Sequence, residues 1–446
     1  MSSFNVVTDK IIGKIKPMHA VNNGPLGGPA SGKWELMKEA GIPFARLHDT
    51  GGAYGGHVYV DIANVFRNFD ADASNPENYD FAFTDWLMKS LVDNGAEPFY
   101  RLGSTIENAH WVKPYNIFPP KDNMQWARIC EGIIKHYTQG WGNGFNYKMT
   151  YWEIWNEPDN EPEIKDNPMW KGTKEQYFEL YRVTANYLKE KFPHLKIGGY
   201  ASCGFYKIAD IEADPNANIS PRIDYFITFF EEFLQYITNE KTKAPLDFFS
   251  WHSYSGVHSN IIFSNYTRET LDKYGLTQTE HLCNEWNPGI KLRGTLRDAT
   301  NIAANMLALH ETSISMMMYY DWRLHCAYNG AINPLFFVPF KAFYSFKGFN
   351  ELYRLGNQIM VETDEKQVDE RVYCMAAKGE DGIAIMLVNY TDNDADLTIS
   401  VDGQKDFVTA QTFMIDEDKT YEDIGGIKGG KLALKKDAIA VIKIAK

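Results

Sequence analysis

The chain has 446 residues, of which 44% are hydrophobic and 23% are charged, and its formal net charge is −13. This composition is ordinary for a globular protein, and no apolar run approaches the roughly 18 residues that a bilayer-spanning helix needs. The acidic balance argues against a nucleic-acid partner, because proteins that bind phosphates carry clustered Lys and Arg. We therefore expect a neutral small-molecule ligand, no nucleic acid and no membrane, and we leave open a homo-oligomer.

The beginning of the chain, MSSFNVVTDK, lacks the basic and apolar regions of a secretory signal. The five cysteines are scattered and have no CxxC spacing. These features predict a cytoplasmic chain with reduced thiols; secretion would apply if a leader had been trimmed from the sequence.

Between residues 13 and 350, short apolar and aromatic runs alternate with longer segments of helical period, which is the pattern of repeated βα units. Eight strand-like runs occur: IKPMHAV, PFARLHD, EPFYRLG, MTYWEIWNE, KIGGYAS, FFSWHSY, EHLCNEWN and SISMMMYYDW. Helical segments follow most of them, for example residues 84–95, 174–192, 222–237 and 299–313. Connections into strands are short, whereas several that leave strands are long, and this asymmetry is typical of a barrel with its active site at the carboxyl ends of the strands.

After about residue 355, short alternating strands separated by turn residues replace this pattern. We predict an α/β protein with a (β/α)8 TIM barrel over residues 13–350. An accessory C-terminal β-sandwich over residues 351–446 is completed by residues 1–12 and packs against the barrel. The longest connection, residues 49–83, would form part of the wall of the site.

The fourth run continues as YWEIWNEPD, which carries two glutamates four residues apart. Because side chains on a strand alternate between its faces, Glu153, Trp155 and Glu157 would share the face that points into the barrel. Glu153 lies about 13 Å earlier along the strand than Glu157, at roughly 3.3 Å per residue. We expect Glu153 to be a buried carboxylate paired with a base such as Arg46, and Glu157 to be accessible at the rim.

A second rim glutamate supports a catalytic interpretation. The seventh run, within HLCNEWNPG, places Glu285 at its end. Cleavage of an acetal needs one protonated carboxyl to release the leaving oxygen and one ionised carboxylate to attack or to activate water. Aromatic side chains near the strand ends could stack on the apolar faces of a sugar ring; these are Trp155, Tyr254, Trp286 and Trp322.

WEIWNEPD and NEWNP, on the fourth and seventh of eight runs, resemble the retaining glycoside hydrolases of the 4/7 clan, and most closely glycoside hydrolase family 39, which includes β-xylosidases. The family's Arg-x-His on the second strand is matched by Arg46 and His48, and its His-x-Tyr on the sixth by His252 and Tyr254. The resemblance covers nearly the whole chain. It implies a (β/α)8 barrel with a β-sandwich, and no metal or other cofactor.

The resemblance further implies that Glu157 is the general acid/base, that Glu285 is the nucleophile of a double displacement, and that Asn156 donates to the 2-hydroxyl of the glycon. Arg46 would hold Glu285 ionised, because a carboxylate that attacks needs a nearby cation, whereas an acid needs apolar or anionic surroundings. The other residues expected to bind substrate are His48, His252, Tyr254, Trp286, Asp321 and Trp322.

The expected activity is that of an exo-acting, β-xylosidase-like enzyme on a small glycoside or oligosaccharide. Relatives that act on xylosides tend to carry a glutamate after the eighth strand, where this chain has Asp321, so the sugar stays open. Other activities implied by the family are α-L-arabinosidase, β-glucosidase, β-galactosidase and α-L-iduronidase. Arg323, Arg101 or Lys113 could bind the carboxylate of a uronic acid, although ordinary loop charges are the simpler interpretation.

Two other classes of protein fit less well. A metal-dependent barrel would use His19, His48, Asp49, His252, His281 and Asp321, but these lack H-x-H or H-E-x-x-H spacing. A non-catalytic sugar-binding protein would keep the aromatic side chains without needing both carboxylates. Cys283, near Glu285, has no neighbouring base in the sequence and is expected to be a small core residue.

Overall fold

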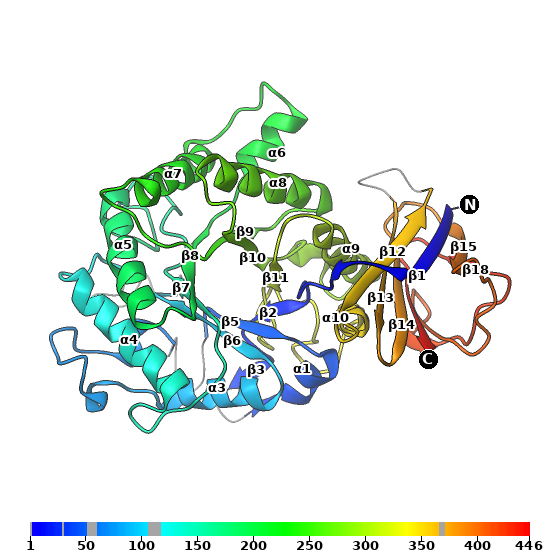
Figure 1. Ribbon diagram of the computed structural model, residues 1–446, viewed down its shortest axis with the longest axis horizontal. Helices are drawn as coiled ribbons and strands as arrows, with labels where there is room; N and C mark the ends of the chain where they lie inside the picture. Colours follow the sequence, from blue (N-terminus) through cyan, green and yellow to red (C-terminus); the bar gives the residue numbers. More distant parts are fainter. Residues whose placement is uncertain (1, 29–30, 51–59, 106–116, 365–370) are drawn as a thin grey trace.

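The computed structural model describes residues 2–28, 31–50, 60–105, 117–364 and 371–446. Within these ranges, eight parallel strands close into a barrel, so the prediction of a (β/α)8 barrel is confirmed (Figure 1). Each barrel strand overlaps one of the eight runs recognised in the sequence. In chain order the strands are β2 (Ala20–Asn22), β5 (Phe44–Leu47), β6 (Glu97–Leu102), β7 (Tyr151–Ile154), β8 (Lys196–Ser202), β9 (Phe248–Ser253), β10 (Glu280–Trp286) and β11 (Met316–Tyr319).

Helices form a ring outside the barrel and cover its outer face (Figure 1). Their starts carry local signals: Thr173 forms a capping box at α5, and Ser220 caps α7, which has Pro221 in its first turn. None of the described helices is long and apolar enough to cross a bilayer. The helices are α1 (Trp34–Ala40), α2 (Ile62–Val65), α3 (Ala82–Asp93), α4 (Asn123–Gln139), α5 (Lys174–Lys191), α6 (Tyr206–Ala213), α7 (Pro221–Thr238), α8 (Val257–Lys273), α9 (Leu296–His310) and α10 (Lys341–Tyr353).

The predicted sandwich is formed by one continuous sheet of nine strands beside the barrel. The amino-terminal strand lies inside this sheet, antiparallel to one neighbour and parallel to the other, and both chain ends are found there (Figure 1). The placement of the boundary at residue 350 stays a prediction. In spatial order the strands are β17 (Thr420–Asp423), β16 (Gln411–Ile415), β19 (Ile439–Ala445), β14 (Gly382–Asn389), β13 (Val372–Gly379), β12 (Asn357–Thr363), β1 (Ser2–Lys14), β15 (Ala395–Val401) and β18 (Lys431–Leu434).

The nine-stranded sheet buries both of its faces. One face continues the barrel core: Met386 and Val441 belong to the same apolar cluster as Phe346 of α10. A β-carbon added at Gly348 of α10 would lie 2.9 Å from Val441 Cγ2, so the helix and the sheet approach closely there. The other face forms a second cluster that joins side chains from distant strands, such as Phe4, and the sheet therefore curls around its own core.

The barrel strand that precedes Glu157 is shorter than predicted, and the predicted alternation beyond it is wrong. β7 ends at Ile154, and both Trp155 and Glu157 have positive φ values, 76° and 46°. Trp155 therefore does not share the inner face with Glu153; its ring packs against Trp170 at 5.1 Å, outside the barrel. The turn still leaves Glu157 at the mouth of the barrel.

We expect Phe4→Ala to lower the free energy of unfolding by about 3–5 kcal/mol, because it removes a large buried side chain from the core of the sheet. Ile11→Ala, on the same strand at a side chain that is 59% exposed, is the matched control and should change it by less than about 0.5 kcal/mol. Urea unfolding measures both. Equal effects of the two substitutions would contradict the packing described for β1.

Candidate active site

The carboxyl ends of three barrel strands bring together the two rim glutamates and a histidine. Glu157 follows β7, His252 lies on β9, and Glu285 lies on β10 as the register partner of His252. One carboxylate oxygen of each glutamate and a ring nitrogen of His252 all lie within 4.8 Å of one another. The residues that the sequence placed on separate strands therefore form one cluster.

Arg46 lies fully buried beneath this cluster and donates to four side chains, one of which is Asn22 at 3.1 Å. Its Nε donates to Glu153 at 2.7 Å, its Nη1 to Glu285 at 3.2 Å, and its Nη2 to the side-chain oxygen of Asn156 at 2.5 Å. Burial opposes the charge of Arg46, but the surrounding carboxylates of Glu153, Glu285 and Asp49 outweigh it and raise the pKa of the guanidinium. Arg46 is thus a permanent cation in the floor of the site.

Glu153 is the structural carboxylate of the pair in YWEIWNEPD. It is fully buried, and besides Arg46 it accepts hydrogen bonds from Ser250 at 2.6 Å and from Asn284 at 2.5 Å. The expected pairing of Glu153 with Arg46 is confirmed. A buried charge with this many donors is stable and inaccessible to a ligand.

The two rim carboxylates have different partners. Glu157 accepts from His252 Nδ1 at 2.7 Å and from Asn160 Nδ2 at 2.8 Å. Glu285 accepts from Tyr254 Oη at 2.6 Å and from Arg46, and His252 Nε2 lies 3.6 Å from it. Glu285 therefore faces a fixed cation, whereas Glu157 faces a group that titrates near neutral pH.

The pKa shifts follow from these partners. Burial raises the pKa of Glu157, but the hydrogen bond and charge of His252 outweigh it and hold that pKa below the usual range. Burial would lower the pKa of His252, and the two glutamates raise it instead. Burial and the charge of Glu157 raise the pKa of Glu285 against the opposing effects of His252 and Arg46.

These directions describe the cluster with a proton on His252. Because Glu157 and His252 share a 2.7 Å hydrogen bond, transfer of that proton to Glu157 leaves a neutral acid beside a neutral imidazole. The transfer removes both the charge of Glu157, which raises the pKa of Glu285, and the charge of His252, which lowers it, while Arg46 remains in place. One proton held between Glu157 and His252 therefore supplies an acid, and Arg46 is the cation that remains beside the carboxylate of Glu285.

A pocket of about 350 Å³ opens above the cluster. Both rim glutamates, His48 and Tyr254 line it, whereas Asn156 and His252 lie buried at its base. The side-chain nitrogen of Asn156 is buried and has no hydrogen-bond partner among the described residues. Among the residues that the structure describes, the lining is formed by His48, Asp49, Glu157, Asn160, Cys203, Tyr206, Arg222, Phe226, Tyr254, Glu285, Tyr320 and Tyr328.

Trp286 and Trp322, which the sequence assigned to substrate binding, are fully buried and neither lines the pocket, so their assignment stays a prediction. Trp322 packs against Phe346 of α10 at 5.3 Å, and Trp286 packs edge-on against a tyrosine of β11. Among the described residues, the aromatic lining of the pocket consists of Phe226 and four tyrosines, one of which is Tyr320, a neighbour of Trp322 in the sequence.

The charged candidates after the eighth strand are bound to each other. Arg323 Nε donates to Asp321 Oδ2 at 2.6 Å, and its Nη2 donates to Tyr320 Oη at 2.9 Å. Asp321 is fully buried and also accepts from Asn23, so it does not reach the pocket as predicted. Arg101 is likewise buried and paired with an aspartate, and Lys113 lies outside the described residues.

The histidines of the metal-dependent alternative do not converge. His19 precedes β2 and His281 lies near the start of β10, so both are at the amino ends of the strands, opposite the pocket. His48 forms a 3.1 Å contact with Asp49, and burial together with nearby cations lowers its pKa well below the usual value, so it is neutral. Among the described residues, one group has the geometry to hold a cation, and it is the cluster of Glu157, His252 and Glu285 itself.

Several pocket residues were missed in the sequence because they come from outside the recognised motifs. Asn160 follows the NEP motif closely enough to have been noticed, whereas Tyr206 and Arg222 come from α6 and α7 and carry no local signal. Tyr320 adjoins Asp321, which was singled out, and its Oη donates to Asp49 at 2.6 Å.

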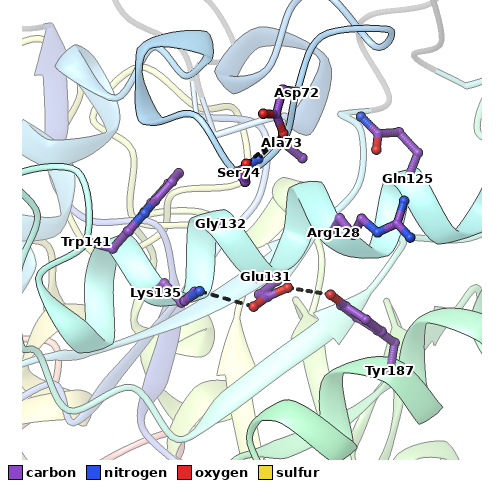
Figure 2. A pocket seen from close by; sticks show the side chains of 10 residues that line it. All are labelled: Asp72, Ala73, Ser74, Gln125, Arg128, Glu131, Gly132, Lys135, Trp141 and Tyr187. Carbon is purple, nitrogen blue, oxygen red and sulfur yellow. Dashed lines mark hydrogen bonds and ion pairs between the residues drawn. The ribbon is translucent and has the colours of Figure 1, made fainter.

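A second hollow of about 380 Å³ lies along α4, on the outer side of the barrel. Figure 2 shows Glu131 between two partners, and its carboxylate accepts from Lys135 at 3.2 Å and from Tyr187 at 2.5 Å. The other carboxylate there, Asp72, accepts from Ser74. Both acids are engaged within the protein, and the chemistry is therefore sought at the barrel mouth.

A parallel barrel with two adjacent carboxylates at its mouth meets the requirements of glycoside hydrolysis. The chain matches the model of the glycosyl hydrolases family 39 over residues 40–307, more than half of its length, and it belongs to this family. The β-xylosidase of Geobacillus stearothermophilus is 27% identical over 207 residues, 45% of this chain and 36% of that protein. The β-xylosidase of Caldicellulosiruptor saccharolyticus is 28% identical over 222 residues, 48% of this chain and 37% of that protein. The matches thus span little more than a third of these relatives.

Solved structures of similar fold cover the whole chain. A glucosidase from Croceicoccus marinus superposes with a TM-score of 0.77 at 18% identity and covers 100% of this chain and 99% of its own. A monomeric β-xylosidase from Caulobacter crescentus CB15 gives 0.69 at 15% identity and 99% coverage of both chains. At these identities the similarity shows the fold alone.

Substitution of Arg46 tests how much the buried cation contributes to the stability of the fold through its ion pair with Glu153. We expect Arg46→Met to lower the free energy of unfolding by about 3–5 kcal/mol, because it leaves Glu153 buried without a cation. The double variant Arg46→Met/Glu153→Gln should recover part of that stability. Urea unfolding of both variants measures this, and an unchanged Arg46→Met protein would contradict the role given to Arg46.

The raised pKa of His252 predicts a pH-dependent contribution to stability. A group whose pKa is raised on folding stabilises the protein below its ordinary pKa, here 6.5, and loses that contribution as the pH rises through the folded value. The difference in unfolding free energy between the native chain and His252→Gln should therefore shrink from pH 6 to pH 9, by about 1.4 kcal/mol for each unit of pKa shift.

His281→Gln is the matched control for this measurement. His281 is equally buried, but burial lowers its pKa to about 3, so it is neutral over the same range. Its difference from the native chain should stay constant above about pH 7.5 and should change in the opposite direction to that of His252→Gln between pH 6 and about pH 7.5, because only the unfolded imidazole takes up a proton there. A constant difference for His252→Gln would show that folding does not shift the pKa of His252, and a difference that grows with pH, as for His281→Gln, would show that His252 carries no proton in the folded protein.

Proposed function

We propose that the protein is a retaining, exo-acting glycoside hydrolase that cleaves a terminal glycosyl residue by double displacement, with β-xylosidase-like specificity. The observation that carries this proposal is the proximity of the rim carboxylates, since an oxygen of Glu157 and an oxygen of Glu285 lie within 4.8 Å. Retaining enzymes hold their carboxyl groups about 5–5.5 Å apart, whereas inverting enzymes need about 6.5–9.5 Å to admit water.

In the first step, Glu285 attacks the anomeric carbon while Glu157 protonates the leaving oxygen. Arg46 and Tyr254 bind the two oxygens of Glu285 and orient it for attack. Formation of the glycosyl ester removes the negative charge of Glu285, which weakens the forces that raise the pKa of His252. In the second step, Glu157 accepts a proton from the water that hydrolyses the ester. Asn156 is assigned to the 2-hydroxyl, because its side-chain nitrogen is a buried donor beside the pair.

A neutral glycon fits the pocket better than a uronic acid. The guanidinium of Arg323 is already bound to Asp321 and to Tyr320, so it has little capacity left for a substrate carboxylate. The pocket of about 350 Å³ lies near the lower end of the range for small-ligand sites, about 300–1,000 Å³, which favours binding of a chain end. The names of the curated relatives favour a xyloside. An α-L-arabinoside, a β-glucoside or a β-galactoside is the alternative.

The decisive test is hydrolysis of aryl glycosides of five sugars (β-xylose, α-arabinose, β-glucose, β-galactose and α-iduronic acid). We expect turnover of the β-xyloside, release of the sugar with the anomeric configuration retained, and a loss of at least about 10³-fold in kcat for Glu285→Ala. On an activated substrate, azide should restore turnover by Glu157→Ala. Azide attacks the glycosyl ester without the general base that water requires. Measurement by NMR identifies the anomer that forms first.

Other outcomes would point to other functions. Inversion of configuration would exclude double displacement, and native rates in both glutamate variants would exclude the proposed pair. Since the same cluster could hold a cation, the assay is repeated with a chelator, and loss of activity would indicate a metal-dependent reaction. Sugar binding without turnover of any oligosaccharide would indicate a non-catalytic protein.

A further inference from the structure

The wall of the pocket next to Glu157 has no assigned role. In the proposed mechanism Glu157 protonates the leaving oxygen, so the leaving group must lie on this side. Outside the recognised motifs, the wall is formed by Asn160 from the loop after β7, Tyr206 at the start of α6, and Arg222 in the first turn of α7. These three elements follow the strands that carry or flank the acid/base.

Asn160 binds Glu157 directly. Its side-chain nitrogen donates to Glu157 Oε2 at 2.8 Å, and its backbone nitrogen donates to the carbonyl of Glu157 at 3.1 Å. His252 occupies the other carboxylate oxygen. Asn160 is only 6% exposed, so its amide has little freedom to turn away. The orientation of the Glu157 carboxylate therefore depends on Asn160 as much as on His252.

Arg222 in turn fixes Asn160. Its Nε donates to the backbone carbonyl of Asn160 at 2.8 Å, and its Nη2 donates to the side-chain oxygen at 3.2 Å. With that oxygen accepting from a guanidinium, the amide nitrogen of Asn160 must point towards Glu157. The side chain of Arg222 also lies 2.8 Å from Glu161 and over the ring of Phe226, at 5.2 Å from its centroid.

Unlike Asn160 and Glu157, Arg222 is exposed to solvent: 45% of its side chain is accessible, and it lines the pocket. Glu161 balances its charge, so the wall presents donors and acceptors with little net charge. Tyr206 adds an aromatic ring next to them. Such a surface suits a hydroxyl-bearing group with apolar faces, which describes a second sugar better than a carboxylate or an apolar aglycone.

We propose that Arg222 and Tyr206 form a leaving-group subsite for a sugar, and that Arg222 and Asn160 are positioning residues for Glu157. The proposal rests on the proposed function, since it gives Glu157 the role of the acid. Contacts between the leaving sugar and Arg222 stabilise the hydrogen bonds from Arg222 to Asn160 and from Asn160 to Glu157 at the step in which Glu157 donates its proton. The effect must therefore depend on how much acid assistance the leaving group requires.

The test compares kcat/KM across leaving groups on the glycon that the enzyme accepts: 2,4-dinitrophenyl, 4-nitrophenyl and phenyl glycosides and the corresponding disaccharide. We expect Arg222→Met and Asn160→Ala to lower kcat/KM about 10- to 100-fold for the phenyl glycoside and the disaccharide. For the dinitrophenyl glycoside, which leaves without protonation, the change should stay below about threefold. Arg222→Lys should restore part of the activity on the disaccharide.

The pH profile provides a second readout. Asn160→Ala removes a donor that favours ionised Glu157, so the alkaline limb of kcat/KM on the phenyl glycoside should move to higher pH. Lys207→Met is the control, because Lys207 forms an ion pair with Asp224 of α7 and lies outside the pocket lining. It should match the native enzyme for every leaving group.

Two results would overturn the proposal: equal losses for all leaving groups in both variants, or native values throughout. Glu157→Ala is measured on the same series to keep the proposed function separate. If Glu157→Ala shows the dependence on leaving group and Arg222→Met does not, only the positioning path and subsite fail. If Glu157→Ala shows none, the acid role itself is wrong. Arg222→Lys and Asn160→Ala decide the question should Arg222→Met fail to fold.

Discussion

The structure depends on the need to satisfy one buried positive charge. Arg46 lies inside the barrel on β5, and a guanidinium there is stable only if carboxylates and other acceptors surround it. Its partners come from three other barrel strands or their ends: Asn22 on β2, Glu153 on β7 and Glu285 on β10. The strands must close in one register for these contacts to form. The closure that stabilises the barrel therefore also places Glu285 beside Glu157.

Because closure of the barrel and placement of the site residues depend on the same contacts, much of the site was predictable from the sequence. Alternating apolar runs identified the barrel strands, and polar residues at their carboxyl ends had to converge because parallel strands end on the same side. Glu157, Glu285 and Tyr254 were proposed in this way, as was the pairing of Arg46 with Glu153, whereas the role of His252 came from the resemblance to family 39. These inferences need only the position of a residue along a strand.

The failures share a different cause, since each depends on what happens after a strand ends. The positive φ values at Trp155 and Glu157 end the alternation, and the chain after β11 directs Trp322 towards α10 rather than the pocket. Arg222 reaches Asn160 from a helix that begins about sixty residues later in the chain. Neither a turn of this kind nor a contact of this range has a local sequence pattern that predicts it. The continuity of the nine-stranded sheet was missed for the same reason.

The position of β1 also constrains the order in which the molecule can assemble. Phe4 pairs with Thr363 on one side and with Ile399 on the other, so β1 has no partners in this sheet until about 360 further residues have been synthesised. The barrel strands can pair during synthesis, but the sheet that shares a core with α10 cannot close before the carboxyl-terminal strands arrive. A nascent chain would therefore expose the apolar residues of β1 throughout the synthesis of the barrel, and that interval is when it most needs protection from aggregation.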